Sequence, residues 1–398
     1  MSTEALGIER SATGRWSDLP DDLHGMILSK VGACPRDRVR FAAVCKAWRE
    51  AVPRHPMPPA APMLLVSPWT CMGTKHLCGP DKSWVFRVPS KVATNKRFVG
   101  SHDGGWIAAF DGQALTVVNL FSGHELALSP QQSLISSIGS PSRYDHTNIC
   151  KIVFSGDPAS TDGCILIALT NGRLYITRCR VGCRQAVWKE HHWSSDLIRD
   201  IVFCNGELYG LTYPDEIVIK FGIGMRETDT PVFTTVHWFF IQSREGSPRY
   251  NEIHASYIME VQGKLSMAVM TRWLPNLDPF FKVFKLVGAD ASLAYSHKWE
   301  EVTSFGSYAL FIGPTWSKGV HVPVGTERHG FKRNHIYYSI HTSLIANKLS
   351  DNVVYSAALN NGDHINMCCK EDQSVGDGVG RTGYYVRNHA MWIYPPDL

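Results

Sequence analysis

The sequence predicts a small all-α module at the N-terminus followed by a large all-β domain. Three observations lead to this prediction. Residues 16–50 carry apolar side chains at helical spacing, residues 53–62 contain five prolines, and the later segments are short runs of Val, Ile, Phe, Tyr and Trp separated by turn glycines. The chain has 398 residues, which leaves room for the module and one β domain of about 330 residues.

The N-terminal module is expected to begin a helix at Pro20, because proline suits the first turn and the acidic Asp21 and Asp22 lie at the positive end of the helix dipole. A second helical stretch is expected from near Asp37 through Val44 to Trp48. The first helix carries an apolar stripe at helical period: Leu19, Leu23, Met26, Ile27 and Val31. About forty residues cannot bury a self-sufficient core, so another protein should complete the burial.

Composition shifts predict the domain boundaries. Residues 1–15 are expected to be a disordered N-terminus, 16–52 the helical module, 53–62 a stiff linker and 63–398 the β domain. The linker prediction follows from its prolines, which favour extended backbone and cannot sustain a helix.

The β domain is predicted to be a β-propeller of six or seven four-stranded blades. Four hairpin turns separate apolar runs, at Asp111-Gly112, Asn171-Gly172, Asn205-Gly206 and, more weakly, Gln262-Gly263. Their glycines lie 60, 34 and 57 residues apart, which is centred on the roughly 40 to 50 residues of a propeller blade. A β-sandwich array or a pair of barrels would also give short strands with glycine turns.

Composition also restricts the partners and the compartment. The formal net charge is only +4 and the basic residues are spread along the chain, so neither nucleic acid nor a membrane surface is an expected partner. No run of 18 apolar residues exists, and the first residues lack the apolar core of a secretion signal. We therefore expect the protein in the cytoplasm, the nucleus or both, with most of its 11 cysteines as reduced, buried thiols.

Candidate reaction chemistry is weak throughout the sequence. Cys179 and Cys183 with His191 and His192 are zinc ligands by type, but two adjacent histidines on an extended segment point to opposite faces. There is no Gly-x-Ser-x-Gly elbow, and the glycine-rich residues 376–380 lack the Lys-Ser/Thr of a P-loop. We expect a non-catalytic protein with no metal or cofactor. Some tryptophans are candidate anchors on exposed loops for a bound protein: Trp188, Trp193, Trp273 and Trp316.

The helical module resembles a known docking motif. With Leu19-Pro20 at its opening, Val44-Cys45-Lys46 in its middle and Trp48-Arg49 near its end, the segment resembles the F-box, which docks substrate receptors on the Skp adaptor of cullin-RING ubiquitin ligases. The resemblance implies that eight residues face the adaptor or support that face: Leu19, Pro20, Leu23, Ile27, Leu28, Val44, Cys45 and Trp48. The sequence departs from the family pattern at His24, Gly25 and Arg38, which would weaken docking. A plain helical hairpin packed on the rest of the chain is the alternative.

The β domain carries a second resemblance. Residues 97–130, with the step Asn119-Leu120-Phe121-Ser122-Gly123, look like the opening of the plant F-box-associated domain of unknown function, a kelch-like β domain. Together the two resemblances imply a substrate-receptor subunit of an SCF-type (Skp-cullin-F-box) ubiquitin ligase, with the adaptor, cullin and RING subunits as partners and an unknown target protein on the β domain. Two alternatives remain: a propeller-based enzyme or small-molecule sensor, or an F-box protein acting outside an active ligase.

Overall fold

The structure is a computed structural model of the chain. It describes residues 16–31, 35–55, 62–67, 75–78, 85–88, 92, 96–111, 113–135, 149–170, 173–179, 186–191, 197–213, 217–239, 241–242, 253–271, 280–288, 297–322, 331–339, 353–358, 361–368 and 389–395. The chain divides into two compact units, Met1–Ala61 with Asp397–Leu398 and Pro62–Pro396. The expected disordered segment 1–15 lies outside the described residues.

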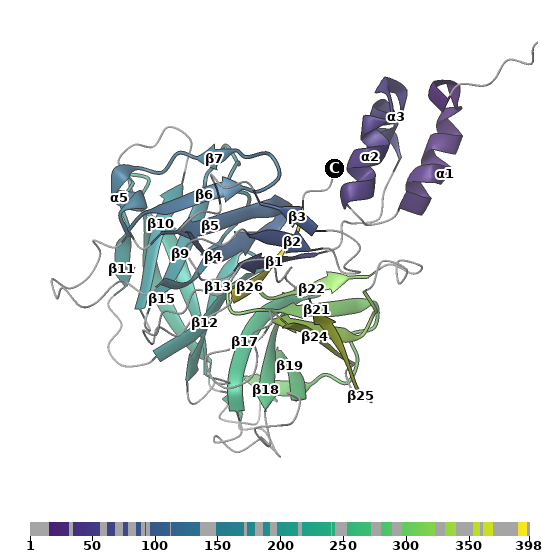
Figure 1. The fold of residues 1–398 in the computed structure, drawn as a ribbon. Helices are drawn as coiled ribbons and strands as arrows, with labels where there is room; N and C mark the ends of the chain where they lie inside the picture. The colour runs from purple at the N-terminus through teal and green to yellow at the C-terminus, as the bar shows by residue number, and fades with distance from the viewer. Residues whose placement is uncertain are drawn as a thin grey trace, which may run out of the picture. The chain divides into compact units, whose positions relative to one another are not determined.

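The first unit is a module of short helices (Figure 1): α1 (Asp21–Val31), α2 (Pro35–Ala43) and α3 (Lys46–Ala51), with single 3-10 turns at Trp16–Asp18 and Val52–Arg54. Pro20 immediately precedes α1, and its carbonyl accepts hydrogen bonds from the N–H groups of Leu23 and His24 at 3.1 and 3.3 Å. The 3-10 turn at Val52–Arg54 overlaps the first two residues of the segment 53–62, for which the prolines predict extended backbone.

The prediction of one continuous second helix is wrong, because the chain breaks between α2 and α3. The Val44 N–H bonds to the Phe41 carbonyl at 3.1 Å, which tightens the end of α2. Cys45 is extended, with φ −162° and ψ 178°, and is the N-cap residue that precedes α3. Apolar spacing continues across the break, so periodicity alone could not locate it.

The second unit is built from small sheets (Figure 1). Three four-stranded sheets have the spatial orders β26-β1-β2-β3, β4-β5-β6-β7 and β11-β10-β9-β8. Their strands are β1 (Met63–Ser67), β2 (His76–Cys78), β3 (Val85–Arg87), β26 (His389–Ile393), β4 (Arg97–His102), β5 (Trp106–Phe110), β6 (Leu115–Asn119), β7 (Glu125–Leu126), β8 (Ile149–Phe154), β9 (Cys164–Thr170), β10 (Arg173–Cys179) and β11 (Lys189–His191). A short helix, α5 (Pro130–Ser133), follows β7.

Three further sheets complete the described part of this unit. Their orders are β12-β13-β14-β15, β16-β20-β19-β18-β17 and β22-β21-β23-β24-β25. Their strands are β12 (Leu197–Cys204), β13 (Glu207–Tyr213), β14 (Val218–Met225), β15 (Pro231–Phe239), β16 (Ile241–Gln242), β17 (Ile253–Val261), β18 (Lys264–Thr271), β19 (Phe280–Gly288), β20 (His297–Glu301), β21 (Tyr308–Ile312), β22 (Lys318–His321), β23 (His335–Ser339), β24 (Val353–Ala358) and β25 (Asn361–Cys368). The last two sheets have five strands, so the expectation of four strands in every sheet is wrong for them.

The sheets form a β-propeller. Strands β4, β8, β12 and β17, each at one edge of its own sheet, contact one another in that order, β17 contacts β22, and β26 contacts β4. The strand β26 pairs with β1 from Met63↔Ile393 to Ser67↔His389, so one sheet joins the two ends of this unit. The Trp392 indole strengthens the closure, donating a hydrogen bond of 3.2 Å to the Ile312 carbonyl, while its own carbonyl accepts one from Ser101.

Two of the four predicted two-residue turns are confirmed, the one at Asp111 is wrong in length, and Asn171-Gly172 lies outside the described residues. Asn205 and Gly206 have φ of 50° and 77° between β12 and β13, and Gln262 and Gly263 have φ of 54° and 71° between β17 and β18. These positive φ values are the ones that a two-residue hairpin turn requires and that glycine readily adopts. The turn at Asp111 is longer, because Phe110 pairs with Leu115 and four residues separate them. No described helix is long and apolar enough to cross a membrane.

Candidate functional site

The helical module has a small core of its own. Leu28, Phe41 and Trp48 are buried together, with the Phe41 and Trp48 ring centroids 4.5 Å apart. The Trp48 indole N–H donates to the Trp16 carbonyl at 2.9 Å, which satisfies the polar end of the buried ring. Two of the eight predicted docking residues, Leu28 and Trp48, are therefore core residues that can only support a docking face.

The other predicted docking residues lie at or near the surface. Leu23 is 37% exposed and Val44 is 51% exposed, and Met26, which shares the α1 stripe, is 63% exposed. Pro20 is exposed as well, and three residues are half-buried: Leu19, Ile27 and Cys45. We call Pro20, Leu23, Met26 and Val44 the exposed apolar set. Apolar side chains of this size gain free energy when a partner covers them.

The two departures from the F-box pattern on α1 have a structural reason. His24 is 3% exposed and packs edge-on against Phe41 and Trp48, so it takes the place of an apolar core residue. Gly25 faces the ring of His55, because a Cβ at this position would come within 2.6 Å of the His55 Nδ1. A glycine here lets the end of the module lie directly on α1.

Asp21 holds the end of the module in place. Its carboxylate oxygens lie 2.7 Å from the Arg54 guanidinium and 3.1 Å from the His55 Nε2. Desolvation raises the pKa of Asp21, but the charges and hydrogen bonds of Arg54 and His55 outweigh it, so the net pKa lies below its ordinary value. The first turn of α1 and the last turn of the module are thus joined by charge.

The propeller contains a cavity of about 220 Å³ where the ends of β4, β8, β12 and β17 meet the connection from β21 to β22. Its walls combine aromatic rings, hydroxyls and charged groups. The residues that matter chemically are His102, Asp103, Lys151, Phe154, Phe203, Glu260, Thr315, Trp316 and Lys318. Of the residues predicted from the sequence as binding candidates, Trp316 lies here. None of the predicted docking residues of the helical module does, and the sequence gives no local motif for a cavity built from five strands.

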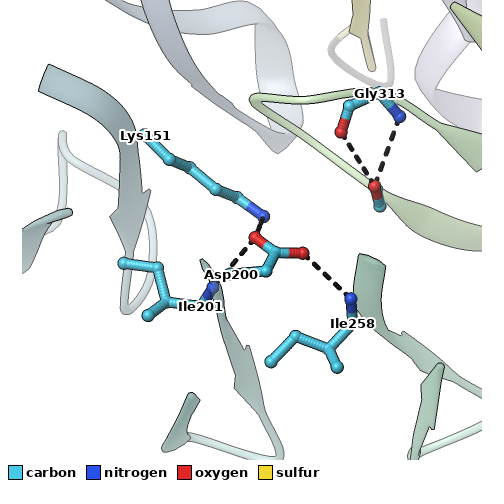
Figure 2. A network of polar contacts seen from close by, with 6 residues as sticks. Lys151, Asp200, Ile201, Ile258 and Gly313 are labelled. Atoms are coloured by element: carbon cyan, nitrogen blue, oxygen red, sulfur yellow. Dashed lines mark hydrogen bonds and ion pairs between the residues drawn. The ribbon is translucent and has the colours of Figure 1, made fainter. Parts of the chain in front are cut away.

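A buried ion pair crosses the inner strands beside this cavity (Figure 2). The Lys151 Nζ lies 2.7 Å from the Asp200 Oδ1, and the two side chains are 4% and 6% exposed. Asp200 also accepts hydrogen bonds of 2.9 Å from the backbone N–H groups of Ile201 and Ile258. One carboxylate therefore links β8, β12 and β17, which belong to three different sheets.

The zinc and P-loop candidates that the sequence disfavours lie only partly within the described residues. Cys179 is buried and receives a weak contact from the Gln132 amide at 3.7 Å, and the His191 ring stacks on Phe233. Cys183 and His192 lie outside the described residues, and among the residues that are described no group of three or more His, Cys, Asp or Glu could hold a metal ion. The glycine-rich residues 376–380 also lie outside the described part.

The predicted tryptophan anchors are not exposed where the structure describes them. Trp188 is 6% exposed and donates its indole N–H to the Gln132 carbonyl at 2.8 Å, and Trp316 is 8% exposed. Trp193 and Trp273 lie outside the described residues. The two described rings therefore fill space inside the propeller, and Trp316 also forms part of the cavity wall.

Comparison with family models defines the class of the protein. The F-box domain matches residues 16–57, which contain the helical module, so the chain is an F-box protein with a C-terminal β-propeller. The KIB1-4 beta-propeller model matches residues 76–369, which are 294 of the 398 residues. The chain belongs to the KIB1-4 beta-propeller family. No curated protein matched the sequence.

Solved structures give only distant matches. A putative 6-phosphogluconolactonase from Bacteroides uniformis is 11% identical, with a TM-score of 0.38, over 77% of this chain and 81% of that one. The yeast Nup82-Nup159-Nup116 nucleoporin complex contains a chain that is 9% identical, with a TM-score of 0.31, over 76% of this chain and 97% of that one. Likenesses at this level support no inference about activity.

Proposed function

We propose that this protein is a substrate-receptor subunit of an SCF-type ubiquitin ligase. The F-box would bind a Skp-family adaptor, and through it the cullin and RING subunits, while the propeller would bind the target protein. The observation that carries the proposal is the exposed apolar set on an F-box whose own core is already filled by Leu28, Phe41 and Trp48.

The proposed role needs no reactive side chain in this chain. A receptor that holds a target near the activated ubiquitin raises the effective concentration of a target lysine, so binding geometry supplies the rate. The residues proposed to contact the adaptor are Leu19, Pro20, Leu23, Ile27, Val44 and Cys45, with Leu28 and Trp48 supporting them from the module core. We propose the cytoplasm, the nucleus or both as its location.

Two finer points belong to the same proposal. We propose that each sheet of the propeller acts as one blade, which is supported by six sheets among the described strands. We also propose kinship with the kelch-like domain of plant F-box proteins, which is supported by the step Asn119 to Gly123. In the structure the Asn119 side chain accepts from the N–H groups of Phe121 and Ser122, both at 3.0 Å, so this step is a defined turn.

Co-purification with a Skp-family adaptor tests the proposal. Leu23→Asp and Val44→Asp each place a charge in the exposed apolar set without touching the module core, and we expect each to reduce adaptor recovery at least about tenfold. Ser29→Asp is the matched control, because Ser29 is exposed on the same helix outside this set. Equal recovery of all three variants would refute the docking assignment. Adaptor binding without cullin in the complex would refute the ligase role while keeping the F-box interaction.

A further inference from the structure

We propose that the propeller cavity binds a basic side chain, arginine or lysine, of a target protein, with Glu260 as its counter-ion. This inference rests on the proposed substrate-receptor function and names the chemistry by which a target would be held. It is carried by the charge balance of the cavity, its size and walls, and one unpartnered hydroxyl.

The charge balance leaves one carboxylate without a cation. The Lys151 ammonium is committed to Asp200 at 2.7 Å, and the Lys318 ammonium pairs with the Asp103 carboxylate and lies 5.5 Å from the centre of the Tyr394 ring. Glu260, in contrast, accepts one long hydrogen bond of 3.4 Å from the Asn205 backbone N–H. It forms no ion pair with any residue that the structure describes. Two cations are thus matched by two aspartates, and the charge of Glu260 remains.

A neighbouring thiol reports the same negative field. The pKa of Cys204 is raised to about 11, first by burial and then by the charges of Glu260 and Glu207. A negative charge disfavours the thiolate and would favour a bound cation for the same reason. The field at this end of β12 therefore has the sign that a basic ligand needs.

The size and the walls suit a single side chain. The cavity of about 220 Å³ is larger than the roughly 150 Å³ cavity that holds one benzene and smaller than the roughly 300–1,000 Å³ of pockets for drug-sized ligands. The rings of Phe154, Phe203 and Trp316 line it. Aromatic faces attract a guanidinium or an ammonium, and they also pack against the apolar stem of arginine and lysine.

Thr315 supplies the third observation. It lines the cavity, is 7% exposed, and its hydroxyl oxygen is buried without a hydrogen-bond partner. The nearby Ser317 hydroxyl is satisfied, because it donates to the Gly313 carbonyl at 3.0 Å and accepts from the Gly313 N–H at 3.3 Å (Figure 2). Buried polar groups nearly always have a partner, and a hydroxyl oxygen can accept a hydrogen bond from a guanidinium or ammonium.

An acidic ligand fits the same cavity poorly. A phosphate or carboxylate would lie near Glu260 and would compete with an aspartate for a lysine whose charge that aspartate already balances. Losing Lys151 would leave the Asp200 carboxylate buried and unpaired, which is strongly unfavourable. A neutral polar ligand could bond to Thr315 but would leave the charge of Glu260 unmatched. The observations favour a cation.

The test uses the full chain and three short peptides, Ac-Gly-Arg-Gly-amide and its Gln and Glu counterparts. Binding is followed by NMR of the tryptophan indole N–H signals at pH 8. The Trp316 signal is assigned with Trp316→Phe. We expect the Arg peptide to shift this signal saturably, the Gln peptide to bind at least about tenfold more weakly, and the Glu peptide not to bind.

Three variants sharpen the test. Glu260→Gln should weaken the Arg peptide at least about tenfold while keeping the side-chain shape, and Thr315→Val should weaken it several-fold. Glu207→Gln is the matched control and should leave binding unchanged, because Glu207 is a nearby carboxylate that pairs with Lys220 at 2.6 Å and does not line the cavity.

Several results would overturn the inference. These are equal binding of the Arg and Gln peptides, wild-type affinity in Glu260→Gln, or tighter binding of the Glu peptide. Free arginine binding as tightly as the Arg peptide would overturn the assignment to a target protein and indicate a small cation instead. Adaptor co-purification of Glu260→Gln keeps the two proposals separate. If the wild-type chain and its cavity variants recover the adaptor normally but none of them binds a peptide, this inference alone is refuted. If Leu23→Asp and the control Ser29→Asp lose adaptor binding to the same extent, the docking proposal is refuted.

Discussion

The buried pair Lys151–Asp200 makes a quantitative prediction about the stability of the propeller. Lys151→Met removes the ammonium and leaves a carboxylate that is 6% exposed with only the N–H groups of Ile201 and Ile258 as partners. Removing one partner of a buried ion pair lowers the free energy of unfolding by about 3 to 5 kcal/mol. Asp200→Leu should lie at the upper end of that range, because it leaves the Lys151 charge unpaired and also removes the acceptor of the Ile201 and Ile258 N–H groups.

The double variant Lys151→Met/Asp200→Leu distinguishes the energetic contribution of the ion pair from that of the hydrogen bonds around it. It has no buried charge, so its main cost is the pair of unsatisfied backbone N–H groups, about 1 to 3 kcal/mol each. We therefore expect the double variant to be more stable than the sum of the single changes predicts, by at least about 2 kcal/mol.

The assay is reversible urea unfolding of the full chain followed by tryptophan fluorescence. Ten of the 12 tryptophans lie after residue 62, so the signal reports mainly the propeller. Lys282→Met is the control, since Lys282 pairs with Glu301 at 3.3 Å on the surface and its loss should cost less than about 1 kcal/mol. A cost below about 1 kcal/mol for Lys151→Met, or an additive double variant, would show that water reaches the pair and would refute the reasoning.

Three further predictions concern single side chains. The pKa of Cys204 is raised to about 11, mainly by burial. Its alkylation by iodoacetamide at pH 8, measured by mass spectrometry, should therefore be about a hundredfold slower than that of a free cysteine. Rapid labelling of Cys204 in the native chain would contradict this prediction. The pKa of Tyr257 is raised from 10.0 to about 12 by burial and by the charge of Asp200. Its contribution to the free energy of unfolding is therefore complete below pH 10, and about 2 to 3 kcal/mol of it is lost as the pH rises to 12. Urea unfolding should show that Tyr257→Phe loses less free energy of unfolding between pH 10 and 12 than the wild-type chain does. Identical pH profiles of the two chains would contradict the prediction. Gly25→Ala should destabilise the module because its Cβ meets His55, yet stabilise it by about 1 kcal/mol in a His55→Ala background, as measured by thermal unfolding; stabilisation in both backgrounds would show that the contact is absent.

The sequence predicted those parts of the fold that local chemistry decides. The turns at Asn205-Gly206 and Gln262-Gly263 were predictable because a two-residue hairpin needs positive φ, and both turns have it. The start of α1 was predictable because proline and acidic residues favour the first turn of a helix. The break at Val44–Cys45 was not, because the apolar spacing of Phe41, Val44 and Trp48 fits one helix as well as two.

The α1 stripe shows why burial was harder to predict than helicity. Spacing grouped Leu23 and Met26 with Ile27, but the module core formed on the neighbouring side of the helix around Leu28, with His24 as a buried ring. A hydropathy pattern does not count a histidine as a core residue. Phe41 and Trp48 determine which side of the helix is buried, because both rings pack edge-on against His24 on that side.

The cavity was not predictable because its residues come from distant strands. Two charged residues within otherwise largely apolar strands were the visible signals, Lys151 in β8 and Asp200 in β12, because such residues need buried partners. The Asp200 partners Lys151 and Ile258 lie 49 and 58 residues away, and only the packing of neighbouring sheets brings them together. Glu260 and Thr315 carry no local motif at all.

The pairing of β26 with β1 has a consequence for biosynthesis. While a ribosome is still translating, β1 has already emerged, but its partner around Trp392 has not, so the first sheet waits with one row of backbone amides and carbonyls open to other chains. A transcript cut short before this codon would leave the same row open permanently. Truncated forms of this protein should therefore occur in cells in aggregates or bound to chaperones, even when every other sheet has formed.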